Sequence, residues 1–140
     1  MVPHGAQAIS AFVWVAVCLY GLRRGPVAPR ILAGALLLNL VEVFALEPLD
    51  RPYHVHVSLL VGDVGVTLAA LWSLRFTRRA WLFVAIGFQL LSLATHLAKA
   101  LDRTLGGWGY VTLAAVWGYA VLGCLVAGVQ AEAGDPGRSS

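Results

Sequence analysis

Five apolar stretches, each long enough to cross a bilayer as a helix, fill this chain and leave only short connections between them. A bilayer core requires about 20 residues of helix, with a tolerated range of about 17–25. The stretches are residues 6–22, 30–46, 55–74, 80–101 and 108–129. The connections contain helix breakers, as in RRGPVAPR, EPLDRPY and DRTLGG. This pattern predicts an all-α, polytopic membrane protein: a compact bundle of five transmembrane helices.

The composition indicates that lipid, and not water, is the solvent for most of the surface. Hydrophobic residues make up 59% of the chain and charged residues 12%, whereas soluble domains are about 45–50% apolar and about 25% charged. The formal net charge of +3 comes from short basic clusters between apolar runs. That arrangement is typical of membrane topology and does not indicate nucleic-acid binding. The predicted partner is therefore the lipid bilayer.

The domain organisation is simple. Residues 1–130 are predicted to form one transmembrane domain, and residues 131–140, AEAGDPGRSS, a disordered cytoplasmic tail. The first apolar stretch is expected to remain in the protein as a helix. No lysine or arginine precedes it, while Arg23 and Arg24 follow it, and a cleaved signal peptide has the opposite order.

The basic residues are distributed unevenly between the two sides of such a bundle. Five spans place the termini on opposite sides, and one side then receives seven of the ten lysines and arginines. The seven are Arg23, Arg24, Arg30, Arg75, Arg78, Arg79 and Arg138, against Arg51, Lys99 and Arg103 on the other side. The positive-inside rule predicts that the N-terminus is outside and the C-terminus cytoplasmic. The predicted location is the cell membrane, as a multi-pass protein, which is the inner membrane if the source is bacterial.

Polar side chains share single faces on three of the predicted helices. Spacings of three, four or seven residues place side chains on one helix face. The three sets are His56, Asp63 and Thr67 in residues 55–74; Gln89, Ser92, His96 and Lys99 in residues 80–101; and Asn39 with Glu42 in residues 30–46. The ionisable members of these sets fall in the outer half of the bundle, and the amide of Gln89 lies near mid-membrane.

The ionisable residues of these three sets are expected to lie at similar depths in the membrane. Glu42 and His96 each lie about five residues from the outer end of their stretch, and Asp63 about eight, which is near 12 Å at ~1.5 Å per residue. An ionised aspartate at the centre of a membrane helix costs about 2.5–3.5 kcal/mol. Glu42, Asp63 and His96 are therefore expected to face the interior. Asp63 is expected to have a polar partner on the second or fourth helix.

Such a cluster permits several functions. The leading hypothesis is a site that binds or passes a proton or small cation, because carboxylates and histidines that are buried together titrate near ambient pH. The candidate residues are Glu42, Asp63, His96, His56, Gln89 and Ser92. A metal site with histidine and carboxylate ligands and a haem held by His56 and His96 are weaker hypotheses, so the cofactor stays open. Interhelical hydrogen bonding without any chemistry is an equally simple interpretation.

Other classes receive less support from the sequence. No phosphate-binding loop or nucleophile elbow is present, so no catalytic residues are predicted and the chain is not expected to be an enzyme. Cys18 and Cys124 fall toward the cytoplasmic side, where a structural disulfide is not expected.

Small residues spaced by four in the last stretch, such as Gly123 and Ala127, favour close helix packing within the chain or between subunits. We expect the protein to form a homo-oligomer or to be a subunit of a larger membrane complex. Two other functions are alternatives to a proton or cation site: a non-catalytic scaffold or accessory subunit, and a phage-type lysis pore.

Overall fold

The described part of the chain is helical and contains no strand. A computed structural model describes residues 4–46, 57–102, 104 and 106–134. The five helices are α1 (His4–Arg24), α2 (Val27–Leu46), α3 (Val57–Ser73), α4 (Ala80–Leu101) and α5 (Gly107–Ala133). Each predicted apolar stretch overlaps one of these helices. The long apolar runs form helices because a helix satisfies its own backbone hydrogen bonds without help from water.

Three of the helices are long and apolar enough to cross a membrane. The candidate spans are Val27–Ala45, Ala80–Leu101 and Gly107–Ala133. α3 is also apolar but has only 17 residues. The described chain is thus an all-helical protein with helices that suit a membrane.

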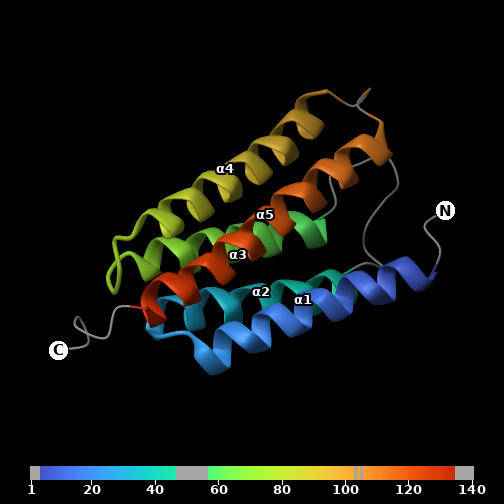
Figure 1. The fold of residues 1–140 in the computed structure, drawn as a ribbon. Coiled ribbons are helices and arrows are strands. Elements are labelled where there is room, and N and C mark those ends of the chain that lie inside the picture. The colour runs from blue at the N-terminus through green and yellow to red at the C-terminus, as the bar shows by residue number, and fades with distance from the viewer. Residues whose placement is uncertain (1–3, 47–56, 103, 105, 135–140) are drawn as a thin grey trace.

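The helices form a closed bundle in which each helix packs against its neighbours in sequence (Figure 1). α1 contacts α2, α2 contacts α3, α3 contacts α4, and α4 contacts α5, which returns to α1. α5 also contacts α2. The start of α1 and the end of α5 lie at opposite ends of the bundle in Figure 1.

One end of the bundle, which we call the arginine end, collects six arginines. The α1–α2 turn at Gly25 and Pro26 and the α3–α4 turn at residues 74–79 both lie there, next to the end of α5 (Figure 1). The six are Arg23, Arg24, Arg30, Arg75, Arg78 and Arg79. At the opposite end, the Asp102 carboxylate accepts hydrogen bonds from the Thr104 hydroxyl at 2.6 Å and the Thr104 amide at 2.9 Å. These bonds hold the pKa of Asp102 below its ordinary value.

The interior is filled by leucine, valine and alanine, while large apolar side chains also cover the outside. The largest fully buried apolar side chains are Leu32, Leu36, Leu82, Leu125, Val66, Val121 and Val129. On the outer surface every helix exposes large apolar groups, among them Phe12 on α1, Leu38 on α2, Leu68 on α3, Leu97 on α4 and Trp108 on α5. Exposed apolar patches of this extent require an apolar surrounding or a partner.

Helix α5 is longer than the apolar stretch predicted for it. The helix continues to Ala133, so residues 131–133 of the predicted tail are helical. The added turn is fixed by contacts from α4 and the turn before it: Arg79 Nη1 donates to the Ala131 carbonyl oxygen at 2.6 Å, and Trp81 Nε1 donates to Glu132 Oε1 at 3.1 Å. The remainder of the predicted tail, from residue 135, lies outside the described residues.

Candidate functional site

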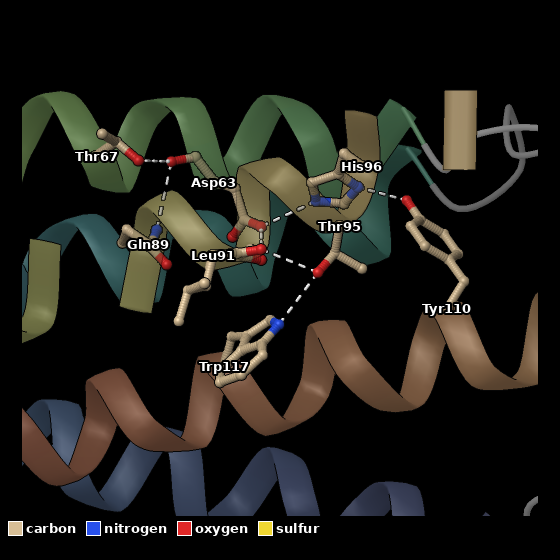
Figure 2. Close-up of polar contacts among 9 residues, drawn as sticks. Asp63, Thr67, Gln89, Leu91, Thr95, His96, Tyr110 and Trp117 are labelled. Carbon is tan, nitrogen blue, oxygen red and sulfur yellow. Dashed lines mark hydrogen bonds and ion pairs between the residues drawn. The ribbon is translucent and has the colours of Figure 1, made fainter. Parts of the chain in front are cut away.

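A half-buried carboxylate on α3, that of Asp63, joins two side chains of α4 (Figure 2). Asp63 Oδ2 accepts a hydrogen bond from Ser92 Oγ and lies 2.9 Å from His96 Nε2. Ser92 and His96 are four residues apart, which places both on the face of α4 that meets α3. The side chain of His96 is 2% exposed and that of Asp63 14%. The expected polar partners of Asp63 are therefore on the fourth helix.

The imidazole of His96 continues the contact to α5. Its Nδ1 atom lies 2.5 Å from the Tyr110 hydroxyl oxygen, and the two rings meet edge-on at 5.4 Å between centroids. Tyr110 is in the first turn of α5 and is 3% exposed. The Asp63–His96–Tyr110 chain thus crosses from α3 through α4 to α5, as Figure 2 shows.

This chain can accommodate either protonation state of His96. A neutral imidazole has one donor and one acceptor nitrogen, and an imidazolium has two donors. In the neutral form with Nε2 protonated, Nε2 donates to Asp63 and Nδ1 accepts from the Tyr110 hydroxyl. In the charged form Nδ1 donates to the phenol oxygen, and the imidazolium lies against the Asp63 carboxylate. A proton can therefore be added at Nδ1 by reorienting one hydroxyl group.

The backbone carbonyl group of Asp63 also accepts hydrogen bonds. Its carbonyl oxygen accepts from Thr67 Oγ1 at 2.7 Å and from Gln89 Nε2 at 3.3 Å. Gln89 is 2% exposed. Gln89 thus lies beside Asp63 but binds its backbone and not its carboxylate, so its contact positions the helix turn that carries the acid.

Of the other predicted members, the structure describes Glu42, which does not join this group. Glu42 is half-buried on α2 and has no hydrogen bond or ion pair with any residue that the structure describes. His56 lies outside the described residues. Between α2 and α3 the close contact is instead made by Asn39, whose side chain occupies the space over Gly62: a Cβ on Gly62 would lie 1.9 Å from Asn39 Oδ1. Asn39 Oδ1 is buried and has no hydrogen-bond partner among the described residues.

Tyr110 is the member that sequence reasoning did not identify. An aromatic residue at the end of an apolar stretch is typical of the membrane interface, so its place in the sequence does not by itself indicate an internal contact. Tyr110 on α5 and His96 on α4 lie at a similar depth on consecutive antiparallel helices, and this similarity was the signal from which their contact could have been predicted. A second α4–α5 hydrogen bond runs from Trp117 Nε1 to Thr95 Oγ1 at 3.1 Å (Figure 2).

The described residues do not gather a set of three metal ligands at this group. Within the described ranges, no three histidine, cysteine or carboxylate side chains converge so that they could hold a metal ion. Both ring nitrogens of His96 are occupied by Asp63 and Tyr110, so ligation of a metal or haem iron would displace one of them. The proposed second haem ligand, His56, is outside the described residues.

Comparison of the chain with known protein families, curated proteins and solved structures finds no match.

Proposed function

We propose that all five helices cross the membrane, with the N-terminus outside and the arginine end in the cytoplasm. Large exposed apolar side chains on α1 and α3, including Phe12 at 74% and Leu68 at 62% exposure, support spans beyond the three longest helices. The collection of six arginines at one end supports the orientation through the positive-inside rule.

Reporter fusions test this topology. A reporter that is active only in the cytoplasm is expected to be active when fused after the C-terminus and inactive when fused before the N-terminus. Replacing Arg75, Arg78 and Arg79 by glutamine reduces the charge bias and is expected to produce a mixed orientation. Activity of the same reporter at the N-terminus of the unaltered chain would contradict the proposal.

We further propose that the outer half of the bundle binds a proton at the Asp63–His96 pair. The observation that carries this function is the 2.9 Å contact between the Asp63 carboxylate and a histidine that is only 2% exposed. Ionisable residues within membrane helices are costly to keep, and they mark proton and ion pathways. The Tyr110 hydroxyl, which can donate to or accept from Nδ1, makes the imidazole suited to both protonation states.

One oxygen of the carboxylate stays available. Both hydrogen bonds of the Asp63 carboxylate are accepted by Oδ2, which leaves Oδ1 without a donor among the described residues. The side chain retains 14% exposure. Oδ1 is therefore the atom at which a proton or hydronium ion would first arrive, and His96 is the group that stabilises or accepts it.

The site suits binding better than continuous conduction through one chain. Toward the arginine end on α3, the hydroxyls of Thr67 and Ser73 donate to carbonyl oxygens of their own helix, those of Asp63 and Ala69. These hydroxyls satisfy the helix backbone and do not extend the chain of side-chain hydrogen bonds. A proton path to the other side would need a second subunit or a change in structure, which agrees with the expectation of a homo-oligomer or larger complex.

Proton movement in liposomes tests this function. The purified protein is reconstituted, at a density at which its subunits can assemble, with a pH-sensitive dye inside the vesicles, and proton uptake is measured for the wild type, Asp63→Asn and Glu42→Gln. Asp63→Asn removes the carboxylate and is expected to abolish uptake. Glu42→Gln is the matched control, because Glu42 is also a half-buried acid in the outer half but is not bonded to His96, and it is expected to retain uptake.

Two outcomes would overturn the proton site. Equal uptake by wild type and Asp63→Asn would remove Asp63 from the function. No uptake by the wild type, together with unchanged assembly of both variants, would leave the structural interpretation: the Asp63–Ser92 and Trp117–Thr95 bonds would then serve only to join helices in a scaffold or accessory subunit.

A further inference from the structure

The arginine end presents positive charge that no described carboxylate neutralises. Five of its six arginines are exposed and have no ion pair with a described carboxylate. They are Arg23, Arg24, Arg30, Arg75 and Arg78. The carboxylate of Glu132, which α5 brings to this end, accepts its hydrogen bond from Trp81. An excess of exposed guanidinium groups of this kind attracts anions.

The α3–α4 turn combines this charge with aromatic surface. The guanidinium carbon of Arg75 lies 4.0 Å from the centroid of the Trp72 ring. Trp72 is 52% exposed and Phe76, within the same turn, is 53% exposed. Aromatic rings with this exposure are favoured at the level of lipid headgroups. A cation and an apolar surface therefore lie side by side at one turn.

The first turn of α4 adds a second attraction for an anion. Arg79 precedes the helix in extended conformation, with φ −80° and ψ 153°, and makes no side-chain cap hydrogen bond. The first amide groups of a helix carry partial positive charge and bind phosphate groups. Arg78, which is exposed, lies immediately before this turn.

We propose that the α3–α4 turn binds the headgroup of an anionic phospholipid, with the phosphate against Arg75, Arg78 and the start of α4. Its acyl chains would lie along the exposed rings of Trp72 and Phe76. A free phosphate ion makes no use of this apolar surface, whereas a lipid uses both parts. The α1–α2 turn is a weaker candidate because, among the described residues, the contact between a guanidinium group and an aromatic ring is made by Arg75 and not by Arg23 or Arg24.

Lipid retention tests the site on the whole protein. The full chain in neutral detergent is titrated with phosphatidylglycerol or phosphatidylcholine, and bound lipid is counted by native mass spectrometry. We expect retention of phosphatidylglycerol over phosphatidylcholine. Each arginine near a membrane contributes about 1 kcal/mol to the attraction, so Arg75→Gln/Arg78→Gln is expected to weaken phosphatidylglycerol binding about 30-fold.

The double variant Arg23→Gln/Arg24→Gln is the matched control, because it removes the same charge from the same end. It is expected to lose only a few-fold in affinity. Equal binding of the two lipids, or equal loss in the two double variants, would overturn the site, as would displacement of the lipid by excess inorganic phosphate. If circular dichroism shows that Arg75→Gln/Arg78→Gln does not fold, Arg78→Gln alone carries the test with a loss of about 5-fold.

Discussion

Replacing His96 by leucine is expected to lower the free energy of unfolding by about 3 kcal/mol. The variant removes the partner of a half-buried carboxylate and leaves Asp63 with only the Ser92 hydroxyl as a donor on its carboxylate. Removing one partner of a buried pair costs about 3–5 kcal/mol when both groups are charged, because the remaining charge is uncompensated. We expect a cost at the lower limit of this range because the Asp63 side chain is 14% exposed. Reversible unfolding in mixed micelles, followed by circular dichroism, measures the change.

The double variant Asp63→Leu/His96→Leu is expected to recover most of this loss. Apolar residues of similar volume replace buried ion pairs with little cost, so the double variant should lie within about 1 kcal/mol of the wild type. Thr95→Val is the control: it breaks the α4–α5 hydrogen bond from Trp117 without touching an ionisable group. Interhelical hydrogen bonds in membranes average about 0.6 kcal/mol, and a loss of that size is expected.

The pair of results separates structure from function. If the double variant is stable but takes up no proton in liposomes, the Asp63–His96 pair is dispensable for the fold and required for the activity. A single variant His96→Leu as stable as the wild type would contradict the buried pair. A double variant less stable than either single variant would instead support a purely structural role for Asp63 and His96.

The number and positions of the helices could be predicted because the constraint is strong. Apolar runs of this length leave a chain no other way to satisfy its backbone hydrogen bonds in lipid. The end of α5 could not be predicted in the same way. Contacts from Arg79 and Trp81 extend the helix to Ala133, and such tertiary contacts are not visible in the hydropathy of a single segment.

The α3–α4 part of the site could be predicted in part, since spacing and depth indicated a polar partner for Asp63 on the second or the fourth helix. Ser92 and His96 are one helical turn apart, and Asp63 lies at the same level on the antiparallel neighbour. Both then reach one carboxylate oxygen. Periodicity fixes which side chains share a face, and the cost of burying an acid in lipid turns that face inward.

The positions of Glu42 and Tyr110 depended on helix rotations that the sequence does not fix. α2 is apolar on nearly all sides, so its amphipathicity does not choose the face that meets α3. The close approach of Asn39 to Gly62 sets that face, and Glu42 then forms no hydrogen bond or ion pair with the described residues of the cluster. Likewise, only the packing of α5 on α4 brings the Tyr110 hydroxyl to His96 instead of the membrane surface.

The second large effect is expected from adding one methyl group to Gly128. A Cβ at this buried position would lie 2.6 Å from two atoms of the Trp81 indole, closer than carbon atoms approach. The ring has little freedom to move, because Trp81 is 7% exposed and its Nε1 donates to Glu132 at 3.1 Å. Overpacking costs about 1–3 kcal/mol. Gly128→Ala is therefore expected to lower the free energy of unfolding by about 2 kcal/mol and to change the fluorescence of Trp81.

Gly123 on the same helix provides the matched control. It is exposed, and a Cβ there would have no neighbour within 4 Å in the described part of the chain. Because alanine is a better helix former than glycine, Gly123→Ala is expected to be neutral or to stabilise by about 0.5–1 kcal/mol. Equal losses in the two variants, at every protein concentration, would contradict the role assigned to Trp81 and indicate a general effect on α5.

Concentration separates packing within the chain from packing between chains. The clash at Gly128 lies inside one bundle, so its cost is expected to be the same in dilute and concentrated protein. A small residue exposed on a membrane helix can also be the place where a second helix approaches. If subunits associate through Gly123, then Gly123→Ala is expected to reduce the oligomer seen by native mass spectrometry, and its effect on stability should appear only at high protein concentration. An unchanged oligomer distribution in Gly123→Ala would exclude this face of α5 as the subunit contact.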